Sequence, residues 1–344
     1  MTEMTMSAWI VSGGTLQRAE LPVPTPPPGF QLLAVRHCGV CGSDLAKLSR
    51  NPISVVHADP WIPGHEIVGA VVGVAPQDLL AVDPLIPCEN CAACERGRVH
   101  LCSSLRRIGW DLPGGFAQYV AVPERNLVAA GGPVDPAVLV LADPLAVAIH
   151  GVRCGLGGEH IGSLAVVGAG TIGICTAAYA ASVGHSVTVF GMRRAVDRPP
   201  SALNRIRIES PPVQLEQVFD AVVDTGSGQD DQPLRHCLGL VRDGGTVIVQ
   251  NAYLPGVRLT EDLRAVFRRS IRIVGSFSFC REHGAGDFTE AVQLLAQNPQ
   301  WALELMQNSS TTSELDEIVL AGGGRRFTKP VVSFNTDRRH NETR

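Results

Sequence analysis

A glycine-rich loop in the middle of the chain constrains the fold more than any other feature. Gly168, Gly170 and Gly173 lie at G-x-G-x-x-G spacing, between a predicted buried strand, Ser163–Val167, and a predicted helix of small residues over 171–183. In this context the glycines permit a tight turn and a close backbone approach to a pyrophosphate. The loop therefore predicts a dinucleotide site on a doubly wound parallel sheet. The residues expected to contact the dinucleotide are Gly168, Gly170, Thr171 and Ile172.

The end of the next predicted strand indicates which dinucleotide binds. That strand, Ser186–Phe190, is followed by Gly191, Met192, Arg193 and Arg194. NAD-binding proteins usually carry Asp or Glu here, because a carboxylate accepts hydrogen bonds from the ribose 2′-hydroxyl. Two guanidinium groups beside a glycine suit a 2′-phosphate instead. We therefore expect NADP(H) in preference to NAD(H), with contacts from Gly191, Arg193 and Arg194. The alternative is that both arginines belong to a solvated loop.

Four of the ten cysteines, Cys88, Cys91, Cys94 and Cys102, are clustered with two, two and seven residues between them. Four thiolates at this spacing can surround one tetrahedral Zn²⁺ and leave no position open, so such a site would be structural. An iron–sulfur cluster is also consistent with four thiolates. In a chain with no predicted secretion signal, clustered cysteines favour metal binding over disulfides.

A second set of potential metal ligands lies in the sequences HCGVCGSD, GHE and LADPLAVAIH. A catalytic zinc takes about three protein ligands and keeps one position open. Cys41 and His65 fit two of these positions if two turns of the β-rich region bring them together. Asp143 is the one acid in an apolar stretch, where burial of an unpaired carboxylate is costly, so it is a candidate third ligand. Each residue alone would fit a structural role, and spacing alone does not connect the three.

Length and composition limit the class of protein. The chain has 344 residues, which predicts two domains, with 45% hydrophobic and 18% charged residues and a net charge of −4. This profile excludes a disordered chain and a polybasic nucleic-acid binder. No run of 18 apolar residues occurs, and the N-terminus MTEMTMSAWIV lacks the basic region of a secretion signal. We expect a cytoplasmic protein with neither nucleic acid nor membrane as a partner.

The predicted secondary structure changes along the chain. From residue 6 to about 140, short β-like runs are separated by Pro and Gly, which indicates a β-barrel or sandwich. After about residue 146, strands and helices alternate, and Phe219–Asp224 and 245–250 are further predicted strands. A helix is predicted near Asp287–Gln297, followed by a short final strand in KPVVSF. The chain is therefore predicted to be α/β, with a β-rich part first.

Seven motifs in series resemble those of the zinc-dependent medium-chain dehydrogenases/reductases, the alcohol, polyol and threonine dehydrogenase group. They are CGVCGSD, PGHEIVG, the four-cysteine cluster, GGFAQYV, ADPLAVAIHG, VVGAGTIG and IVGSF, in the family's order along the whole chain. The resemblance implies a GroES-like β-barrel catalytic domain, formed by residues 1–145 and 276–344. It also implies a Rossmann domain with a doubly wound parallel sheet, inserted as residues 146–275.

The resemblance also implies roles for the residues of the second metal set. Cys41 and His65 match ligands of the family's catalytic zinc, and Glu66 matches an acid that can swing onto the metal. Asp143 stands where the polyol and threonine branch usually has a glutamate ligand. Because Asp is one methylene shorter, both direct ligation and a bridging water are open. The four-cysteine cluster matches the structural site, so two Zn²⁺ per chain are expected.

Two further positions concern proton transfer and the orientation of the ligands. Ser43 matches the hydroxyl that passes the substrate proton, and Asp44 matches the acid beside the zinc-bound histidine. The histidine often found in the family's CGSDLH motif is Ala46 here, so the usual onward relay is absent. His57, in the following loop, is either a substitute for it or simply a loop histidine.

As an activity, the resemblance implies hydride transfer between NADP(H) and a secondary alcohol or ketone. A polyol, sugar or aminocyclitol is the expected substrate, with ketone reduction as the expected direction. Trp110 and Asp111 are candidates for the substrate pocket, and a core role for Trp110 fits as well. The family implies a homodimer or homotetramer. A zinc-stabilised NADPH-binding protein of the same fold without turnover is the alternative.

Overall fold

The computed structural model describes most of the chain as two compact units. One unit combines Met1–Asp143 with Arg281–Arg344, and the other is Pro144–Cys280. The sequence analysis predicts the domain boundaries after residues 145 and 275, and the boundaries of the two units follow residues 143 and 280. The described residues are 4–48, 59–74, 79–132, 134–158, 162–191, 206–209, 217–226, 228–297, 300–306, 311–312, 315–320 and 329–334.

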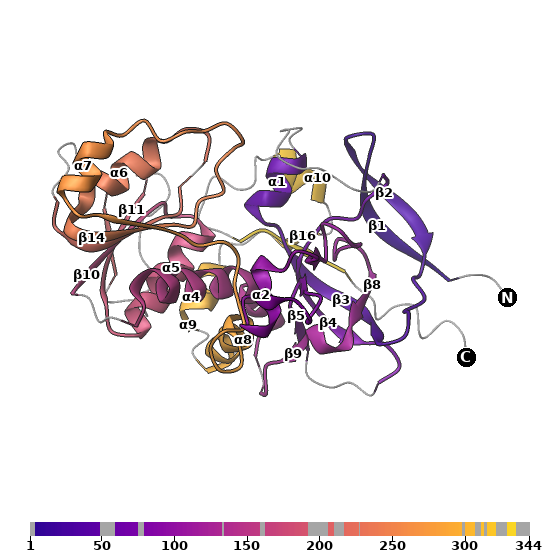
Figure 1. Ribbon diagram of the computed structural model, residues 1–344. Coiled ribbons are helices and arrows are strands. Elements are labelled where there is room, and N and C mark those ends of the chain that lie inside the picture. Colours follow the sequence, from indigo (N-terminus) through magenta and orange to yellow (C-terminus); the bar gives the residue numbers. More distant parts are fainter. Residues whose placement is uncertain are drawn as a thin grey trace. The chain divides into compact units, whose positions relative to one another are not determined.

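A seven-stranded sheet forms the centre of the first unit (Figure 1). Its order is β16-β17-β3-β4-β5-β9, with β8 also paired to β3, and all pairs except β16–β17 are antiparallel. Buried side chains from several strands form one core, including Leu33, Ile67 and Val120. The strands are β3 (Phe30–Gly39), β4 (Glu66–Val71), β5 (Leu80–Val82), β8 (Tyr119–Pro123), β9 (Leu127–Ala129), β16 (Thr311–Thr312) and β17 (Val331–Ser333).

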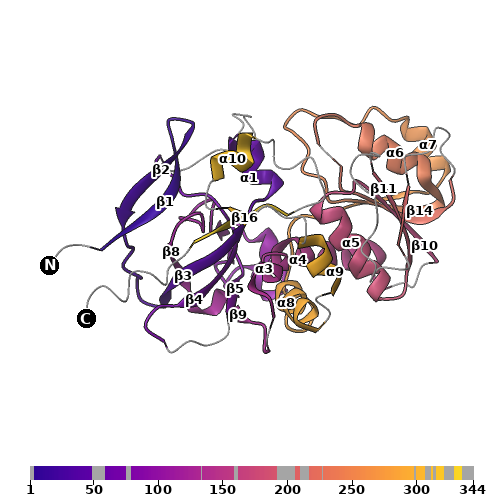
Figure 2. The same ribbon diagram turned by 180° about the vertical axis from the view of Figure 1, so that it is seen from behind.

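The C-terminal segment completes this unit. α10 lies next to α1 in both views (Figures 1 and 2), and its Leu315 and Ile318 are buried in the same core. In α8 the buried residues Phe288, Ala291 and Leu295 recur at helical spacing, which is why this helix is predictable from the sequence. The remaining elements are the hairpin β1 (Thr5–Ser12) and β2 (Thr15–Pro22), the pair β6 (Leu85–Ile86) and β7 (Arg106–Arg107), α1 (Gly42–Leu48), α2 (Ala92–Glu95), α3 (Pro136–Leu139), α8 (Asp287–Gln297), α9 (Gln300–Met306), α10 (Leu315–Leu320), and short 3-10 turns at Val99–Leu101 and Glu124–Asn126.

The second unit is a parallel sheet in the order β12-β11-β10-β13-β14-β15. The strand order reverses between β10 and β13, and α5 lies on one side of the sheet with α6 and α7 on the other (Figures 1 and 2). This unit and the β-rich first unit confirm the predicted α/β fold class. Its elements are α4 (Ala142–Leu156), which begins at the end of the first unit, β10 (Ser163–Val167), α5 (Thr171–Ser182), β11 (Ser186–Phe190), β12 (Ile206–Glu209), β13 (Phe219–Asp224), α6 (Gln232–Leu240), β14 (Val241–Val249), α7 (Leu263–Arg268) and β15 (Arg272–Gly275).

Several elements differ from the sequence-based expectation. α4 is a helix of 15 residues in a stretch that the sequence shows only as apolar. β12 pairs with β11 in a stretch for which the sequence predicts no strand, and β14 begins at Val241 rather than at residue 245. Among the described residues, no helix has both the length and the apolar character that crossing a membrane requires.

Candidate functional site

Cys41, His65 and Glu66 come together in the first unit. β3 and β4 are antiparallel neighbours with Gly39 opposite Glu66, so the turn that carries Cys41 lies beside the start of β4. Each residue offers a ligand atom that lies within 4.8 Å of the other two. His65 and Glu66 are buried, and Cys41 is partly exposed. A sulfur, a nitrogen and an oxygen at this separation form the mixed donor set that zinc binds.

Gly64 explains how His65 reaches this position. Its φ of 95° lies in the left-handed region, where a side chain would be strained. A Cβ at Gly64 would also lie 2.8 Å from the sulfur of Cys38 and 2.9 Å from the ring of Phe116. The glycine therefore turns the chain tightly against the core, and the next residue, His65, enters the site.

Asp44 contacts both the cysteine and the histidine of this set. It is fully buried in the first turn of α1, and its Oδ2 accepts a hydrogen bond from the Cys41 amide at 3.1 Å. Its Oδ1 lies 3.5 Å from Nδ1 of His65. A carboxylate in this position can fix the orientation of the imidazole. The orienting role of Asp44 stays a prediction.

The electrostatics of the cluster favour a positive charge at its centre. Burial by itself lowers the pKa of His65, but the carboxylate of Asp44 and the sulfur of Cys41 outweigh it and raise that pKa well above its usual value. A buried imidazole that favours its cationic form indicates a surplus of negative groups around it. These residues therefore fit a bound cation, and a cation would replace the proton of His65.

Asp143 lies close to this cluster but outside the group of three. It is the second residue of α4 and is buried. Burial raises its pKa to about 7, the charge of His65 opposes that rise, and the charge of Glu66 adds to it. Asp143 is thus near enough to interact electrostatically with both residues. Its direct ligation of a metal stays a prediction.

Lys329 is a member of the site that the sequence analysis misses. It precedes β17, is 2% exposed, and its ammonium group pairs with the carboxylate of Glu66. Burial alone lowers the pKa of Lys329, but the negative charges of Glu66, Cys41 and Asp143 outweigh it and raise that pKa. The signal that the sequence offers for this role is a lysine directly before the apolar run PVVSF.

Ser43 and Ala46 lie on α1, beside the cluster in sequence. Ser43 is the second residue of the helix, precedes Asp44 directly, and is partly exposed. Ala46 follows three residues later, so the helix offers no imidazole at the position where the family often has one. His57 lies outside the described residues.

An aromatic ring lies next to His65. The ring centroids of Trp110 and His65 are 6.3 Å apart, at an interplanar angle of 51°. The guanidinium carbon of Arg107 lies 4.6 Å from the centre of the Trp110 ring, and Nε of Arg107 donates to Asp111 at 3.2 Å. The cation–π contact and the ion pair together hold the indole in place. Trp110 thus lies beside His65 and is held by Arg107, which the sequence analysis does not single out. The place of Trp110 and Asp111 in a substrate pocket stays a prediction.

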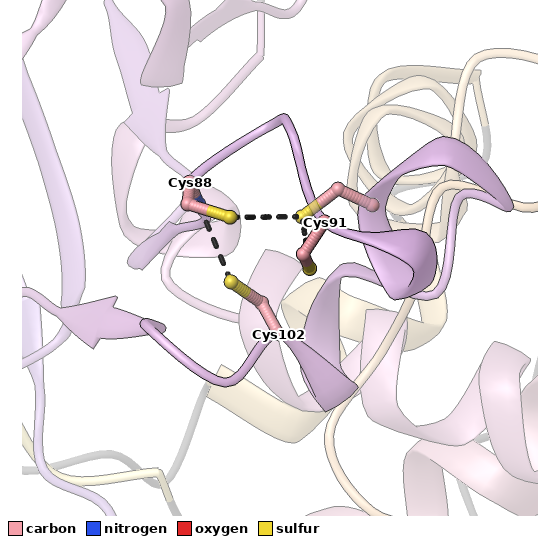
Figure 3. Close-up of side chains that lie close together, drawn as sticks. Cys88, Cys91 and Cys102 are labelled. Atoms are coloured by element: carbon pink, nitrogen blue, oxygen red, sulfur yellow. Dashed lines mark hydrogen bonds between the residues drawn. The ribbon is translucent and has the colours of Figure 1, made fainter.

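The four clustered cysteines form a compact sulfur site around α2 (Figure 3). The Sγ atoms of Cys91 and Cys94 are 3.5 Å apart, those of Cys88 and Cys94 are 3.9 Å apart, and the Cys88 amide donates to Cys102 at 3.3 Å. None of the four forms a disulfide, and their four sulfur atoms lie within 4.8 Å of one another. Hydrogen bonds from the Cys94 amide and thiol lower the pKa of Cys91 to about 6, which favours a thiolate. The donor set fits a tetrahedral metal ion.

The glycine loop of the second unit has the geometry that the sequence predicts. Gly168 has a φ of 111°, and a Cβ there would lie 2.6 Å from the carbonyl oxygen of Thr225. A Cβ at Gly173 would overlap the carbonyl oxygen of Gly168. Gly170, directly before α5, has no atom within 4 Å of an added Cβ, so its backbone is open to a ligand. Thr171 and Ile172 begin α5, where helix amides lack intrahelical partners.

Gly191 continues this cradle at the end of β11. It is buried, and an added Cβ would lie 2.6 Å from Cβ of Ala169 in the glycine loop. The loop and Gly191 therefore pack together at the carboxyl ends of adjacent strands, where doubly wound sheets bind dinucleotides. Arg193 and Arg194 lie outside the described residues, so the basis of the NADP prediction stays in the sequence.

Comparison with known proteins shows the family of the chain. Residues 27–132 match the family described as the alcohol dehydrogenase GroES-like domain. Over 336 residues, the chain is 31% identical to D-altritol 5-dehydrogenase of Agrobacterium fabrum, and the matched region covers 89% of this chain and 92% of that protein. The chain belongs to the zinc-dependent medium-chain dehydrogenase/reductase family. The resemblance found in the sequence motifs is thereby confirmed.

Two further members of this family extend the comparison. L-galactonate-5-dehydrogenase of Escherichia coli is 29% identical and covers 91% of this chain and 94% of that protein. The crystal structure of a zinc-binding dehydrogenase from Sinorhizobium meliloti, bound to NADP, is 26% identical, with a TM-score of 0.82 over 96% of this chain and 100% of that one. As a family member, this protein is an oxidoreductase of the alcohol and polyol dehydrogenase type that uses zinc and a nicotinamide cofactor.

Proposed function

We propose that the protein reduces a ketone of a polyol, sugar or aminocyclitol to the secondary alcohol, with NADPH as the hydride donor. The observation that carries this proposal is the convergence of Cys41, His65 and Glu66, with ligand atoms within 4.8 Å of one another. The names of two relatives, an altritol and a galactonate dehydrogenase, support a polyhydroxylated substrate.

The proposed metal content is two Zn²⁺ per chain. The catalytic ion is assigned to Cys41 and His65, with Asp143 or Glu66 as the third protein ligand, and the structural ion to the four cysteines. A Zn²⁺ at the catalytic site supplies Lewis acidity toward a carbonyl or alcohol oxygen. Asp44 holds His65 in the orientation that ligation needs, because its carboxylate lies 3.5 Å from Nδ1.

Proton transfer is assigned to Ser43. In the reductive direction the substrate carbon takes a hydride from the nicotinamide, and its oxygen takes a proton. Ser43 is partly exposed, only two residues from Cys41, so its hydroxyl can pass that proton and recover one from water. Because Ala46 replaces the usual histidine, we propose that α1 carries no imidazole to extend this relay.

The preference for NADP(H) is assigned to Gly191, Arg193 and Arg194. Gly191 leaves room at the end of β11, where an added Cβ would meet Ala169. Two arginines follow in place of an acid, and their guanidinium groups suit a 2′-phosphate. The bound NADP of the related crystal structure supports this assignment. Cells keep the NADP pool reduced, so the preference also motivates the reductive direction.

The substrate pocket is proposed to include Trp110. Its ring lies 6.3 Å from His65 and is held by Arg107, so a broad apolar face lies beside the proposed metal. The carbon face of a sugar or cyclitol ring can pack on such a surface while its hydroxyl groups keep their polar partners.

We further propose a cytoplasmic homodimer or homotetramer. β15 lies at the edge of the parallel sheet, where backbone groups are available for pairing. Large apolar side chains near it are exposed: Leu263 by 75%, Phe267 by 81% and Ile273 by 41%. Exposed apolar clusters of this kind mark interfaces between proteins.

The experiment is zinc analysis combined with turnover. We expect two Zn²⁺ per chain in the wild type and one in each of the variants Cys41→Ser and Cys94→Ser. Wild type should reduce ketoses faster with NADPH than with NADH, and Cys41→Ser should lose this activity. If both the wild type and Cys41→Ser hold one Zn²⁺, and NADPH binds without turnover, the chain is a zinc-stabilised binding protein instead. Faster alcohol oxidation with NAD would contradict the reductive direction.

A further inference from the structure

A buried ion pair connects the candidate catalytic site with the C-terminal segment of the chain. Lys329 and Glu66 are each 2% exposed, and the lysine ammonium group contacts the glutamate carboxylate. The two residues are 263 positions apart in the sequence. Two buried charges that pair in this way keep each other ionised, and removal of one leaves the other uncompensated.

Gly39 makes this pair possible. It lies in the middle of three neighbouring strands, opposite Glu66 of β4 on one side and Val331 of β17 on the other. A Cβ at Gly39 would overlap the Glu66 carboxylate and lie 2.9 Å from Cε of Lys329. The ion pair therefore occupies the space that a side chain at position 39 would fill. The Val40 amide, which donates to the Pro330 carbonyl oxygen at 2.8 Å, fixes the strand that carries the lysine.

The same carboxylate has a second possible partner. One oxygen of Glu66 lies within 4.8 Å of ligand atoms of both Cys41 and His65. A metal ion at that site would attract this oxygen, and Lys329 attracts it as well. Both oxygens of the carboxylate contact the Lys329 ammonium group, so an oxygen that turns to a metal has to give up part of that contact. The strength of the lysine contact therefore decides how strongly Glu66 competes for the metal.

We propose that Lys329 is a positioning residue that holds Glu66 off the catalytic metal and so keeps one coordination position open to the substrate oxygen. The inference rests on the proposed function of the Cys41 site. It gives Glu66 the role of a restrained alternate ligand, with Cys41, His65 and Asp143 as the resident set. Without Lys329, the carboxylate occupies the position that the substrate needs.

The test replaces the zinc with Co²⁺, whose visible d–d absorption reports the number and type of ligands. Subtraction of the spectrum of Cys41→Ser isolates the catalytic site from the four-cysteine site. We expect Glu66→Gln to leave this difference spectrum unchanged, because Glu66 is not a resident ligand. Lys329→Met should shift it to the spectrum of a site whose open position is taken by a carboxylate, and the double variant Lys329→Met/Glu66→Gln should restore the wild-type spectrum. The conservative variant Lys329→Arg, which keeps the charge, should retain the wild-type spectrum.

Steady-state kinetics provide a second readout. We expect Lys329→Met to raise KM for the ketone by about tenfold, because the freed Glu66 carboxylate then competes with the substrate oxygen for the open position. Loss of an outer partner of a metal site typically changes affinity or activity by about 10- to 100-fold. KM for NADPH should stay constant, and the double variant should recover part of the ketone affinity.

Three outcomes overturn the inference. One is a Glu66→Gln spectrum that differs from wild type, since Glu66 would then already be a ligand. Another is a Lys329→Met spectrum identical to wild type. If Lys329→Met does not fold, the Glu66→Gln spectrum and the double variant, which leaves no unpaired charge, still decide. The third is the absence of any Cys41-dependent Co²⁺ signal in wild type. This result would contradict the proposed function as well, whereas the first two outcomes contradict only the role of Lys329.

Discussion

The carboxylate of Asp44 contacts the amide of Cys41 at 3.1 Å and lies 3.5 Å from Nδ1 of His65. One fully buried side chain therefore links the two candidate ligands, of which Cys41 follows β3 and His65 directly precedes β4. The same charge helps to raise the pKa of His65 well above its usual value. Asp44 thus couples the geometry of the site to its preference for a cation.

Removal of this charge should weaken the catalytic metal site selectively. We expect Asp44→Asn to lower the zinc affinity of the Cys41 site by about 10- to 100-fold, the usual effect of losing a partner of a metal-bound histidine. The four-cysteine zinc should stay bound. Competition with a chelator, followed by metal analysis, measures both. Glu124→Gln, which removes an exposed carboxylate of the same unit, serves as the control, and equal zinc loss in the two variants would contradict the role of Asp44.

A methyl group at Gly170 should block the cofactor without disturbing the fold. The backbone conformation of Gly170, with a φ of −77°, is accessible to alanine, and no atom lies within 4 Å of the added Cβ. We expect Gly170→Ala to keep the melting temperature and to lose about tenfold or more in NADPH affinity, which is about 1.4 kcal/mol. Fluorescence titration with NADPH measures this. Gly132→Ala is the matched control, because its added Cβ also meets open space. Unchanged NADPH binding in Gly170→Ala would show that the pyrophosphate does not approach this residue.

The predicted cofactor preference depends on two neighbouring arginines. Each charge-assisted hydrogen bond to a phosphate contributes about 1.5–3 kcal/mol, so the variant Arg193→Ala/Arg194→Ala should raise KM for NADPH by about tenfold or more. KM for NADH should change little, because NADH has no 2′-phosphate. Initial rates at varied cofactor concentration measure the two values. A parallel rise of both KM values would indicate that the arginines act on the loop rather than on the phosphate.

Local patterns in the sequence predict much of the fold and one candidate metal site. β10, α5 and β11 are recognisable because strand, glycine loop and helix follow one another directly, and the cysteine cluster lies within one short segment. α4 escapes prediction because Ala146, Ala148 and Ile149, which lie on different sides of the helix, are all buried, so the helix has too little polar surface to show a clear period.

The catalytic site is harder to predict, because its residues meet only through strand pairing. The types of Cys41 and His65 indicate zinc, but the register that places Gly39 opposite Glu66 is what joins them. Lys329 reaches Glu66 only because β17 pairs with the other edge of β3. No spacing rule connects residues that are 263 positions apart. Ion pairs of this kind need the three-dimensional arrangement of the sheet.

The aromatic ring beside His65 should contribute to substrate binding. Trp110 lies 6.3 Å from the imidazole and is held by Arg107. If a sugar or cyclitol packs on this face, Trp110→Ala should raise KM for the ketone by about tenfold while KM for NADPH stays constant, since a large apolar contact area is lost. Trp110→Phe should have a smaller effect. Kinetics with a polyhydroxylated ketone and with a small aliphatic ketone distinguish a contact between Trp110 and the substrate from a structural role of Trp110. An equal loss for both substrates would point to a structural role.

A carboxylate of the parallel sheet should make stability depend on pH. Oδ2 of Asp220 accepts hydrogen bonds from the Ser163 amide at 2.8 Å and hydroxyl at 3.1 Å, and Oδ1 accepts one from Arg242 at 2.7 Å. Burial raises the pKa of Asp220, but these hydrogen bonds outweigh it, so the pKa lies below the ordinary 3.8. The folded state therefore favours the ionised form.

The sign of the effect follows from this shift. The stabilisation by the Asp220 carboxylate is fully present above the unfolded pKa of 3.8, and it is lost as the pH falls through the lower folded pKa. Asp220→Asn should lower the melting temperature at neutral pH, and its difference from wild type should shrink below pH 3.8. Calorimetry over this range measures the difference. Asp243→Asn is the control: its carboxylate also pairs with an arginine, Arg269, but is 72% exposed, so its loss should matter less. A pH-independent deficit in Asp220→Asn would assign the loss to packing rather than to charge.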